Sequence, residues 1–389
     1  PKRDWSSDVC SSDLLDTIPW WEQKLWNLYD PLACPINFVN TSLIAYSGEI
    51  DAQKAAADLM EAALLKEGIK MTHIIGPKTG HAFEPEAKKV VAKLVDEATV
   101  KGIDHQPKKV TLVTHSLKFS RAHWVTIDAM EKHWEPASIT ATLENGNLVA
   151  YPRNVAAFTL SPKGSGANRS SGYVISVDGK APKSLPKAES FSDIPGLFHF
   201  EKRNGDWWMI GKPATSSTDL RKKHNLQGPI DDAFMDSFVM VRPTGQPLNT
   251  AVGQWAKIEL AEAAFHWRRY FRGEPRVKDD SAITDDDIKN SNLVLWGDPS
   301  SNKLLARIAD KLPIQWNAAG IKVGDKTYDA TKHAPAFIFP NPLNPSRYVV
   351  INSGFTFPQF AGASNSLQTP KLPDWAILDL SVPLADRVA

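Results

Sequence analysis

The first strongly patterned stretch of the chain alternates short apolar runs with a segment of helical spacing. Residues 43–46 form an apolar run that ends in a Ser-Gly turn, and Asp51 follows this turn. In residues 52–67 the apolar positions recur three and four residues apart, which predicts an amphipathic helix, and a glycine then gives a stop signal. Residues 69–75 predict a buried strand, so the pattern as a whole is typical of a βαβ unit.

A glycine-bracketed loop follows the second predicted strand and ends in a histidine. The loop covers residues 76–81, and Pro85 suits the first turn of a further helix. The carboxyl ends of neighbouring parallel strands lie at one edge of a sheet, where open α/β sheets bind their ligands. Asp51 and His81 are therefore placed so that a carboxylate can orient an imidazole, and we expect a catalytic pair. The alternative is that each is an ordinary cap, turn or structural residue.

The amino-acid sequences of these two turns resemble those of one family of hydrolases. Residues 45–51 read Ala-Tyr-Ser-Gly-Glu-Ile-Asp, and residues 80–83 read Gly-His-Ala-Phe. Both resemble the last part of the catalytic domain of prolyl-oligopeptidase-like proteins, the S9 class of serine peptidases and their esterase-like relatives. The resemblance implies an α/β-hydrolase fold, with Asp51 as the triad acid and His81 as the triad base. It implies a peptide substrate, and the runner-up is an acyl ester, for instance of an acetylated polysaccharide.

A serine nucleophile with the expected surroundings does not occur before Asp51. A nucleophile elbow needs Gly-x-Ser-x-Gly between a strand and a helix, and in α/β-hydrolases the serine precedes the acid. The nearest approach is residues 362–366, Gly-Ala-Ser-Asn-Ser, which lacks the last glycine and which we interpret as a polar loop. We therefore expect the chain to be the carboxyl-terminal part of a larger serine hydrolase and to be inactive alone. The alternative is a non-catalytic binding or structural module on a hydrolase-like scaffold.

The extreme amino terminus does not follow the pattern of the rest of the chain. Residues 4–14, Asp-Trp-Ser-Ser-Asp-Val-Cys-Ser-Ser-Asp-Leu, resemble the translation of a short-read sequencing adapter and show no apolar period. We expect residues 1–14 to be a disordered artefact and the native protein to begin near Leu15. Residues 15–38 are rich in aromatic residues, and their apolar spacing predicts a short amphipathic helix over the sheet.

The pattern of apolar and polar residues changes after residue 105, where short apolar runs recur with turn signals between them. Asn-Gly pairs at residues 145–146 and 204–205 are typical of two-residue β-hairpins. Regular short strands of this kind predict a β-rich, antiparallel sandwich or barrel-like module in residues 106–210. The predicted strands are residues 110–114, 123–127, 138–143, 147–151, 156–160, 173–177, 197–201 and 207–210.

Residues 211–389 return to a mixed α/β pattern. A long helix is predicted at residues 252–272, and a strand at residues 293–296 leads through a Gly-containing turn into another helix. This segment resembles the tail that follows the hydrolase domain in some large prolyl-oligopeptidase-like proteins, and we expect an accessory role. The predicted fold class is therefore α/β plus β: an incomplete α/β-hydrolase sheet in residues 15–105, the β-rich module, and a mixed α/β carboxyl-terminal domain.

Other polar and aromatic residues provide weaker candidate sites. His115, His123 and His133 could share a metal ion only if different strands brought them onto one surface, and paired tryptophans could form a carbohydrate platform instead of core. The turn after residue 296 could hold an anion on helix amides, but it lacks a nucleotide-binding motif.

The acidic residues of the carboxyl-terminal segment have ordinary structural interpretations. We expect Asp298 and Ser300 to cap the helix that follows them. Residues 279–287 contain several aspartates, which predict a solvated loop and a helix start, with calcium binding as the alternative.

Composition excludes several classes of protein. The 389 residues are 42% hydrophobic and 23% charged, as in ordinary globular proteins, and the formal net charge is +1. That charge gives no electrostatic reason to expect nucleic acid, and no apolar run is long enough to span a membrane. Of the two cysteines, Cys10 lies in the adapter-like segment, so no internal disulfide is expected. We expect no cofactor and no metal. The sequence does not indicate the oligomeric state or the localisation, for which secreted and periplasmic are the alternatives.

Overall fold

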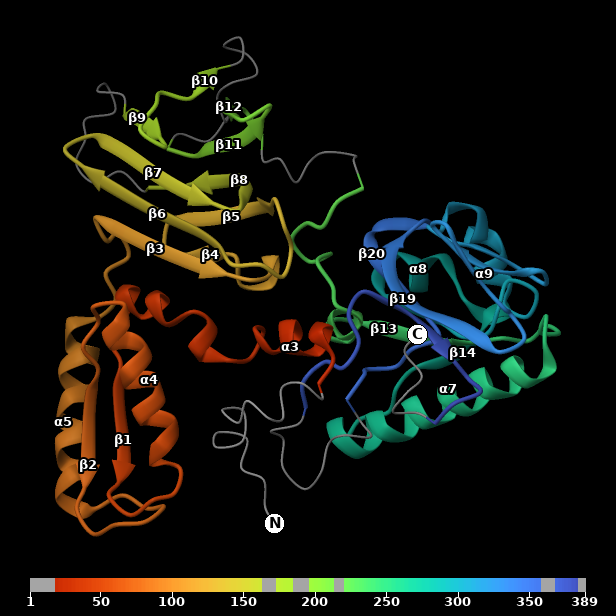
Figure 1. The fold of residues 1–389 in the computed structure, drawn as a ribbon, viewed down its shortest axis with the longest axis horizontal. Helices are drawn as coiled ribbons and strands as arrows, with labels where there is room; N and C mark the ends of the chain where they lie inside the picture. Colours follow the sequence, from red (N-terminus) through yellow and green to blue (C-terminus); the bar gives the residue numbers. More distant parts are fainter. Residues whose placement is uncertain (1–17, 163–172, 185–195, 213–219, 358–367, 384–389) are drawn as a thin grey trace. The chain divides into compact units, whose positions relative to one another are not determined.

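The computed structural model, drawn in Figure 1, describes residues 18–162, 173–184, 196–212, 220–357 and 368–383. Contacts within the chain divide it into two compact units. One unit contains Asn27–Asn225, and the other joins Pro19–Trp26 to Leu226–Ala389. The domain limits predicted at residues 105 and 210 stay a prediction. The adapter-like segment and the Gly-Ala-Ser-Asn-Ser segment both lie outside the described residues.

A parallel strand pair flanked by helices forms the first part of the Asn27–Asn225 unit. β1 (Ile44–Gly48) pairs in parallel with β2 (Thr72–Gly76). α4 (Lys54–Lys66) connects the two strands and contacts β1, whereas α5 (Pro85–Lys101) follows β2 and contacts both strands. Figure 1 draws the two strands between the two helices. The predicted strand–helix–strand order is confirmed, so the chain leaves β1 and β2 at the same edge of the pair.

Side-chain amides hold the segment before β1 against the edge of β3 (Lys109–Thr114). The Asn37 side chain donates to the carbonyl of Val113 at 2.8 Å and accepts from its N–H at 2.7 Å. Asn40 makes the same two hydrogen bonds with Thr111, at 2.6 and 3.3 Å. The two asparagines thus imitate the backbone of a neighbouring strand. The 3₁₀ helices of this segment are Pro31–Ala33 and Pro35–Asn40.

Two β-sheets share one hydrophobic core in the rest of this unit. Among the described residues, one sheet has the strand order β3-β6-β7-β9 and the other has the order β10-β12-β11-β8-β5-β4. Leu112 and Ile139 from the first sheet and Phe158 and Phe200 from the second are buried in the same cluster. These described strands do not form a closed barrel. The strands are β4 (Arg121–Ala122), β5 (Val125–Met130), β6 (Ala137–Glu144), β7 (Asn147–Arg153), β8 (Val155–Leu160), β9 (Val174–Val177), β10 (Lys183–Ser184), β11 (Phe198–Arg203) and β12 (Asp206–Ile210).

Two strand pairs in these sheets are parallel, whereas the sequence pattern predicts antiparallel neighbours. β7 pairs in parallel with β9, and β10 pairs in parallel with β12. Between β7 and β9 the chain passes through β8, which belongs to the other sheet. A chain that crosses away and returns brings the next strand in the parallel direction, and this crossover has no local sequence signal.

Both predicted Asn-Gly hairpins are confirmed. Asn145 and Gly146 join β6 to β7, and Asn204 and Gly205 join β11 to β12. All four residues have a positive φ, between 50° and 84°. A two-residue turn that matches strand twist needs this backbone conformation, and Asn and Gly adopt it at the lowest cost.

A mixed sheet is the centre of the second unit. In the described part of this unit, the strand order is β14-β13-β15-β20-β19-β21, and a smaller antiparallel sheet has the order β16-β17-β18. The neighbours from β14 to β20 pair in parallel, whereas β19 pairs antiparallel with both β20 and β21. The strands are β13 (Phe238–Arg242), β14 (Val277–Asp279), β15 (Asn292–Leu295), β16 (Gln315–Asn317), β17 (Gly320–Val323), β18 (Lys326–Tyr328), β19 (His333–Asn341), β20 (Asn344–Ile351) and β21 (Trp375–Asp379).

Helices cover both faces of this mixed sheet. α7 (Thr250–Phe271) packs on the face that contains Met240, and α8 (Asp285–Asn290) and α9 (Lys303–Ile308) pack on the face that contains Val241. Successive strand residues point to opposite faces, so β13 supplies both cores. The predicted mixed α/β character is confirmed. Among the described helices, none combines the length and apolar character that a bilayer crossing requires.

The short aromatic-rich helix predicted before β1 is present, but it belongs to the second unit. α3 (Trp20–Trp26) buries Leu25 and accepts a hydrogen bond from Lys371 through Glu22. Helical spacing predicts that one face of a helix is buried, but it does not identify the surface that buries it. The expected position of the helix over the parallel strand pair stays a prediction.

The cap of α9 also differs from the prediction. Asn302 is the N-cap residue, and its side chain accepts hydrogen bonds from the N–H groups of Leu304 and Leu305. The Asp298 carboxylate accepts from the N–H groups of Ser300 and Leu248 instead, so it closes the turn before the helix. The anion-binding alternative loses its support, because the first N–H groups of the helix already donate to the side chains of Asn302 and Asp280.

Two aspartates expected in a solvated loop are buried. Asp280 accepts hydrogen bonds from the hydroxyl of Thr244 and from the N–H of Lys303. Asp287 accepts from the ammonium group of Lys278 and forms a capping box with Thr284 at the start of α8. These partners satisfy both carboxylates, so their burial is explained by hydrogen bonds within the chain. The predicted helix start is confirmed.

Candidate active site

The loops that follow β1 and β2 are joined by backbone hydrogen bonds. The N–H of Glu49 donates to the carbonyl of Gly76, and the N–H of Ile50 donates to the carbonyl of Thr79. Gly48 allows this approach, because a Cβ on it would lie 2.2 Å from the carbonyl oxygen of Thr79. The two loops therefore leave the strand pair as one connected layer, which carries an acid from the first loop and a histidine from the second.

Asp51 and His81 are in direct contact at this edge. Nδ1 of His81 lies 3.0 Å from Oδ2 of Asp51. The Asp51 side chain is 13% exposed, whereas the His81 side chain is 77% exposed. A carboxylate can only accept a hydrogen bond, so Nδ1 carries the hydrogen and Nε2 keeps its lone pair on the open side of the ring.

The backbone at the start of α4 keeps the Asp51 carboxylate ionised. The N–H of Gln53 donates to Oδ1 of Asp51 at 3.0 Å, and this bond is the main cause that lowers the pKa of Asp51 below its ordinary value. Desolvation opposes this shift, and the hydrogen bond and charge of His81 add to it. A carboxylate that stays ionised can hold one tautomer of the imidazole and stabilise its protonated form.

An aromatic contact supports the loop that carries His81. The ring of Tyr46 stacks on Phe83 with centroids 4.3 Å apart. The Tyr46 hydroxyl donates to the carbonyl of Ala82 at 2.9 Å and accepts from the N–H of Glu84 at 2.8 Å. Backbone on both sides of Phe83 is therefore attached to β1, which limits the positions open to His81.

The start of α5 fixes the other end of this loop. Glu84 is the N-cap residue of α5, and its carboxylate accepts from the N–H of Ala87 at 2.6 Å. This bond is the main cause that lowers the pKa of Glu84. Pro85 occupies the first helical position as predicted, where its missing N–H leaves no donor unsatisfied.

Within the described residues, the Asp51 carboxylate is the only hydrogen-bond partner of the His81 side chain. The Gly-Ala-Ser-Asn-Ser segment, which has the spelling nearest to a nucleophile elbow, is not among these residues. The described geometry therefore contains an acid and a base in contact, and the exposed face of the imidazole is open to a partner.

The other histidines considered for a metal do not converge among the described residues. Nε2 of His123 lies 3.3 Å from the carbonyl oxygen of Asn40, and Nδ1 of His115 lies 3.6 Å from the sulfur of Cys34. Burial lowers the pKa of His133 to about 4, so its ring is neutral at pH 7. Trp124 and Trp207 are buried, in agreement with core packing.

Cys34 and His115 line a cavity of about 190 Å³ beside β3. Burial, with a smaller contribution from Asp30, raises the pKa of the Cys34 thiol to about 11. Burial also lowers the pKa of His115. Both groups are therefore neutral at pH 7, and the sulfur lacks the thiolate form that a nucleophile requires.

A second serine, histidine and aspartate are linked inside the β-rich part of the same unit. Nδ1 of His224 lies 3.2 Å from Oγ of Ser120, and its Nε2 lies 3.0 Å from Oδ1 of Asp128. In hydrolytic triads the serine contacts Nε2 and the acid contacts Nδ1, so the ring is reversed here. Asp128 also accepts a hydrogen bond from Thr159, and both Ser120 and Asp128 are buried. We interpret this group as a structural network between strands.

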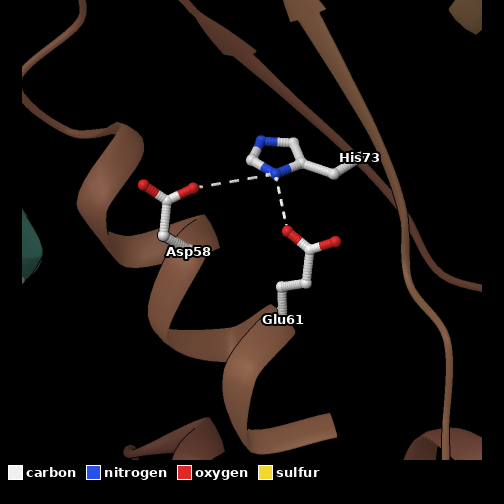
Figure 2. A group of neighbouring side chains, drawn as sticks. All are labelled: Asp58, Glu61 and His73. Atoms are coloured by element: carbon white, nitrogen blue, oxygen red, sulfur yellow. Dashed lines mark hydrogen bonds and ion pairs between the residues drawn. The ribbon is translucent and has the colours of Figure 1, made fainter. Parts of the chain in front are cut away.

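One cluster of potential metal ligands was missed in the sequence. Asp58, Glu61 and His73 bring one ligand atom each to within 4.8 Å of one another (Figure 2). The signal available in the sequence was two acids three residues apart on a helix and a histidine in the next strand.

The chain matches no protein-family model, no curated protein and no solved structure.

Proposed function

We propose that this chain supplies the acid and the general base of a serine hydrolase, with Asp51 as the acid and His81 as the base. The observation that carries the proposal is the 3.0 Å contact between Nδ1 of His81 and the Asp51 carboxylate, with the His81 ring largely exposed. The order of acid before histidine agrees with α/β-hydrolases, in which the chain order is serine, acid, histidine.

The proposed chemistry assigns one step to each side chain. Nε2 of His81 accepts the proton from the hydroxyl of a serine as its oxygen attacks the substrate carbonyl, and it returns that proton to the leaving group. Asp51 stabilises the imidazolium ion that forms between these two transfers. The serine and the two backbone amides that bind the oxyanion belong to a part of the parent protein outside these residues.

The favoured substrate is a peptide bond, in a prolyl-oligopeptidase-like serine peptidase. The spelling of residues 45–51 and 80–83 supports this choice. Acyl-ester hydrolysis uses the same acid and base, so assays of the full-length parent must include both an activated ester and a proline-containing peptide. Cleavage of the ester alone would identify an esterase.

The test is substitution of the pair in the full-length parent protein. Asp51→Asn and His81→Ala are each expected to reduce hydrolysis of p-nitrophenyl acetate on the order of 10³-fold or more, because the members of a triad act as a unit. His105→Ala is the matched control, since His105 is also exposed and follows α5, the helix that His81 precedes. Equal activity of all four proteins would refute the assignment.

The 389-residue chain permits a second test that needs no nucleophile. Long-range ¹H–¹⁵N NMR of His81 is expected to detect the tautomer with hydrogen on Nδ1, and Asp51→Asn is expected to reduce its population. The exposed Asp96 provides the control variant Asp96→Asn. A His81 tautomer unaffected by Asp51→Asn would contradict the pairing in solution, whatever the parent hydrolyses.

A further inference from the structure

Asp58, Glu61 and His73 point toward one another between α4 and β2 (Figure 2). Asp58 and Glu61 are three residues apart on α4, so their side chains lie on the same face of the helix. His73 projects from β2 toward that face. Nδ1 of the imidazole and one oxygen of each carboxylate lie within 4.8 Å of one another.

The shortest separation between these atoms equals that of two ligands around a small cation, and the others lie within 4.8 Å. Nδ1 of His73 lies 3.4 Å from Oε2 of Glu61 and 3.9 Å from Oδ1 of Asp58. The contact with Glu61 is a hydrogen bond at its long limit, whereas a charge-assisted bond to a carboxylate is shorter, at about 2.7–2.9 Å. Two ligands that each lie about 2.1 Å from zinc in tetrahedral geometry are about 3.4 Å apart.

The orientation of His73 is fixed by a second hydrogen bond. Nε2 of His73 lies 3.0 Å from Oγ of Ser47 on the neighbouring strand. The His73 side chain is 5% exposed and Ser47 is buried, so the ring has little freedom to turn. A hydrogen bond from the other ring nitrogen is the usual support of a metal-binding histidine, because it aims the free lone pair at the metal.

The two carboxylates leave room for water in the remaining coordination positions. The side chains of Asp58 and Glu61 are both 48% exposed. The ammonium group of Lys54 contacts both oxygens of Asp58, at 2.7 and 2.8 Å. It is a competing cation at the start of α4, and its side chain is 30% exposed, so it can turn toward solvent.

We propose that Asp58, Glu61 and His73 bind one divalent transition-metal cation, for which zinc is the test case. One imidazole nitrogen and two carboxylate oxygens suit zinc or manganese, with water completing the shell. The cation joins α4 to β2 and has a structural role. The site does not contain Asp51 or His81, so the proposal stands independently of the proposed hydrolase function.

The experiment is calorimetric titration of ZnCl₂ into the 389-residue chain, with variants that keep the size of each ligand. We expect one zinc ion per chain at this site, and Glu61→Gln and Asp58→Asn are expected to weaken binding more than about tenfold. Glu67→Gln and Asp96→Asn are the controls, since both acids are exposed and lie outside the cluster. The ligand variants replace exposed side chains, so they are expected to fold.

A third kind of variant separates this site from adventitious binding. Lys54→Gln removes the competing ammonium group and is expected to strengthen zinc binding. Cobalt(II), added in place of zinc, is expected to give visible absorption bands that Glu61→Gln abolishes. The proposal is overturned if zinc does not bind, or if the ligand variants and Lys54→Gln bind it like the unaltered chain.

Discussion

Gly48 and Thr79 approach so closely that no side chain fits between them. A Cβ on Gly48 would lie 2.2 Å from the carbonyl oxygen of Thr79 and at the same distance from that of Gly80. The N–H of Ile50 donates to the same Thr79 carbonyl, so the loop that carries His81 is bonded to the turn that carries Asp51. The absence of a side chain at Gly48 thus sets the distance between the acid and the base.

Gly48→Ala is expected to separate Asp51 from His81. The added methyl group must displace the backbone of residues 79–80, which costs about 1–3 kcal/mol of stability, as overpacking does elsewhere. Long-range ¹H–¹⁵N NMR of His81 measures the effect as a loss of the tautomer with hydrogen on Nδ1. Gly80→Ala is the control, because a Cβ there meets nothing within 4 Å. The same His81 spectrum in both variants would contradict the role given to Gly48.

Asn37→Ala is expected to expose the edge of β3. The variant removes both hydrogen bonds to Val113 and leaves its N–H and carbonyl without their partner. Loss of this support costs about 1–3 kcal/mol, the usual range for a polar group left unsatisfied. Amide hydrogen exchange at Val113 measures the change directly. Exchange at Val113 that stays as slow as in the unaltered chain would show that Asn37 does not protect this edge.

Asp231 is expected to make the second unit less stable as pH rises from about 4 to above 6. Burial raises the pKa of Asp231 from 3.8 to about 6, although hydrogen bonds from Thr356 oppose the shift. Between these two values the folded state holds a proton that the unfolded state has released, so folding weakens as pH rises through this window. Hydrogen exchange of β13 amides in urea at pH 5 and pH 7 measures the difference in stability.

Asp231→Asn isolates this contribution from those of other titrating groups. An amide cannot ionise, so the variant is expected to lose the part of the pH dependence that comes from residue 231. Asp310→Asn, at an exposed position in the same unit, is expected to keep the full dependence. Identical pH profiles for the unaltered chain and Asp231→Asn would show that Asp231 titrates normally.

Local pattern predicts those elements of this chain that local interactions determine. The strands β6 and β7 were expected because apolar residues run to either side of an Asn-Gly turn, and the turn has the positive φ values that these residues favour. α7 was expected from apolar spacing over several turns. In each case the signal and its cause lie within the same short segment.

Long-range pairing is the part of the fold that the sequence does not reveal. The parallel pair of β7 and β9, and the burial of Asp280 with Thr244 and Lys303, depend on segments far apart in the chain. The sequence does not show whether the carboxylate of an aspartate accepts its hydrogen bonds from water or from a hydroxyl group of the protein. The polarity of these aspartates therefore predicts solvent-exposed positions. In the folded chain some of them, such as Asp280, are buried.

The contact between Asp51 and His81 can be predicted from the sequence, because each residue follows the carboxyl end of one of two neighbouring parallel strands. Asp51 and His81 were expected to meet at one edge, and the structure brings them into contact. Asp58, Glu61 and His73 converge across a helix and a strand, and this convergence depends on how α4 packs on the strand pair. The residue pattern does not predict how α4 packs, so the cluster is identified only from the structure.

The contacts that assemble Asp51 and His81 also have a consequence for the order of folding. The bonds that join the two loops, between Asp51 and His81, between Tyr46 and Glu84, and between Glu49 and Lys78, connect residues that all precede β3 in the chain. Their formation therefore needs no strand of the later sheets, and a region made first can fold first. During synthesis this region can reach its folded geometry before the strands that follow it have left the ribosome. A nucleophile supplied by any other segment would then meet an acid and a base already in place.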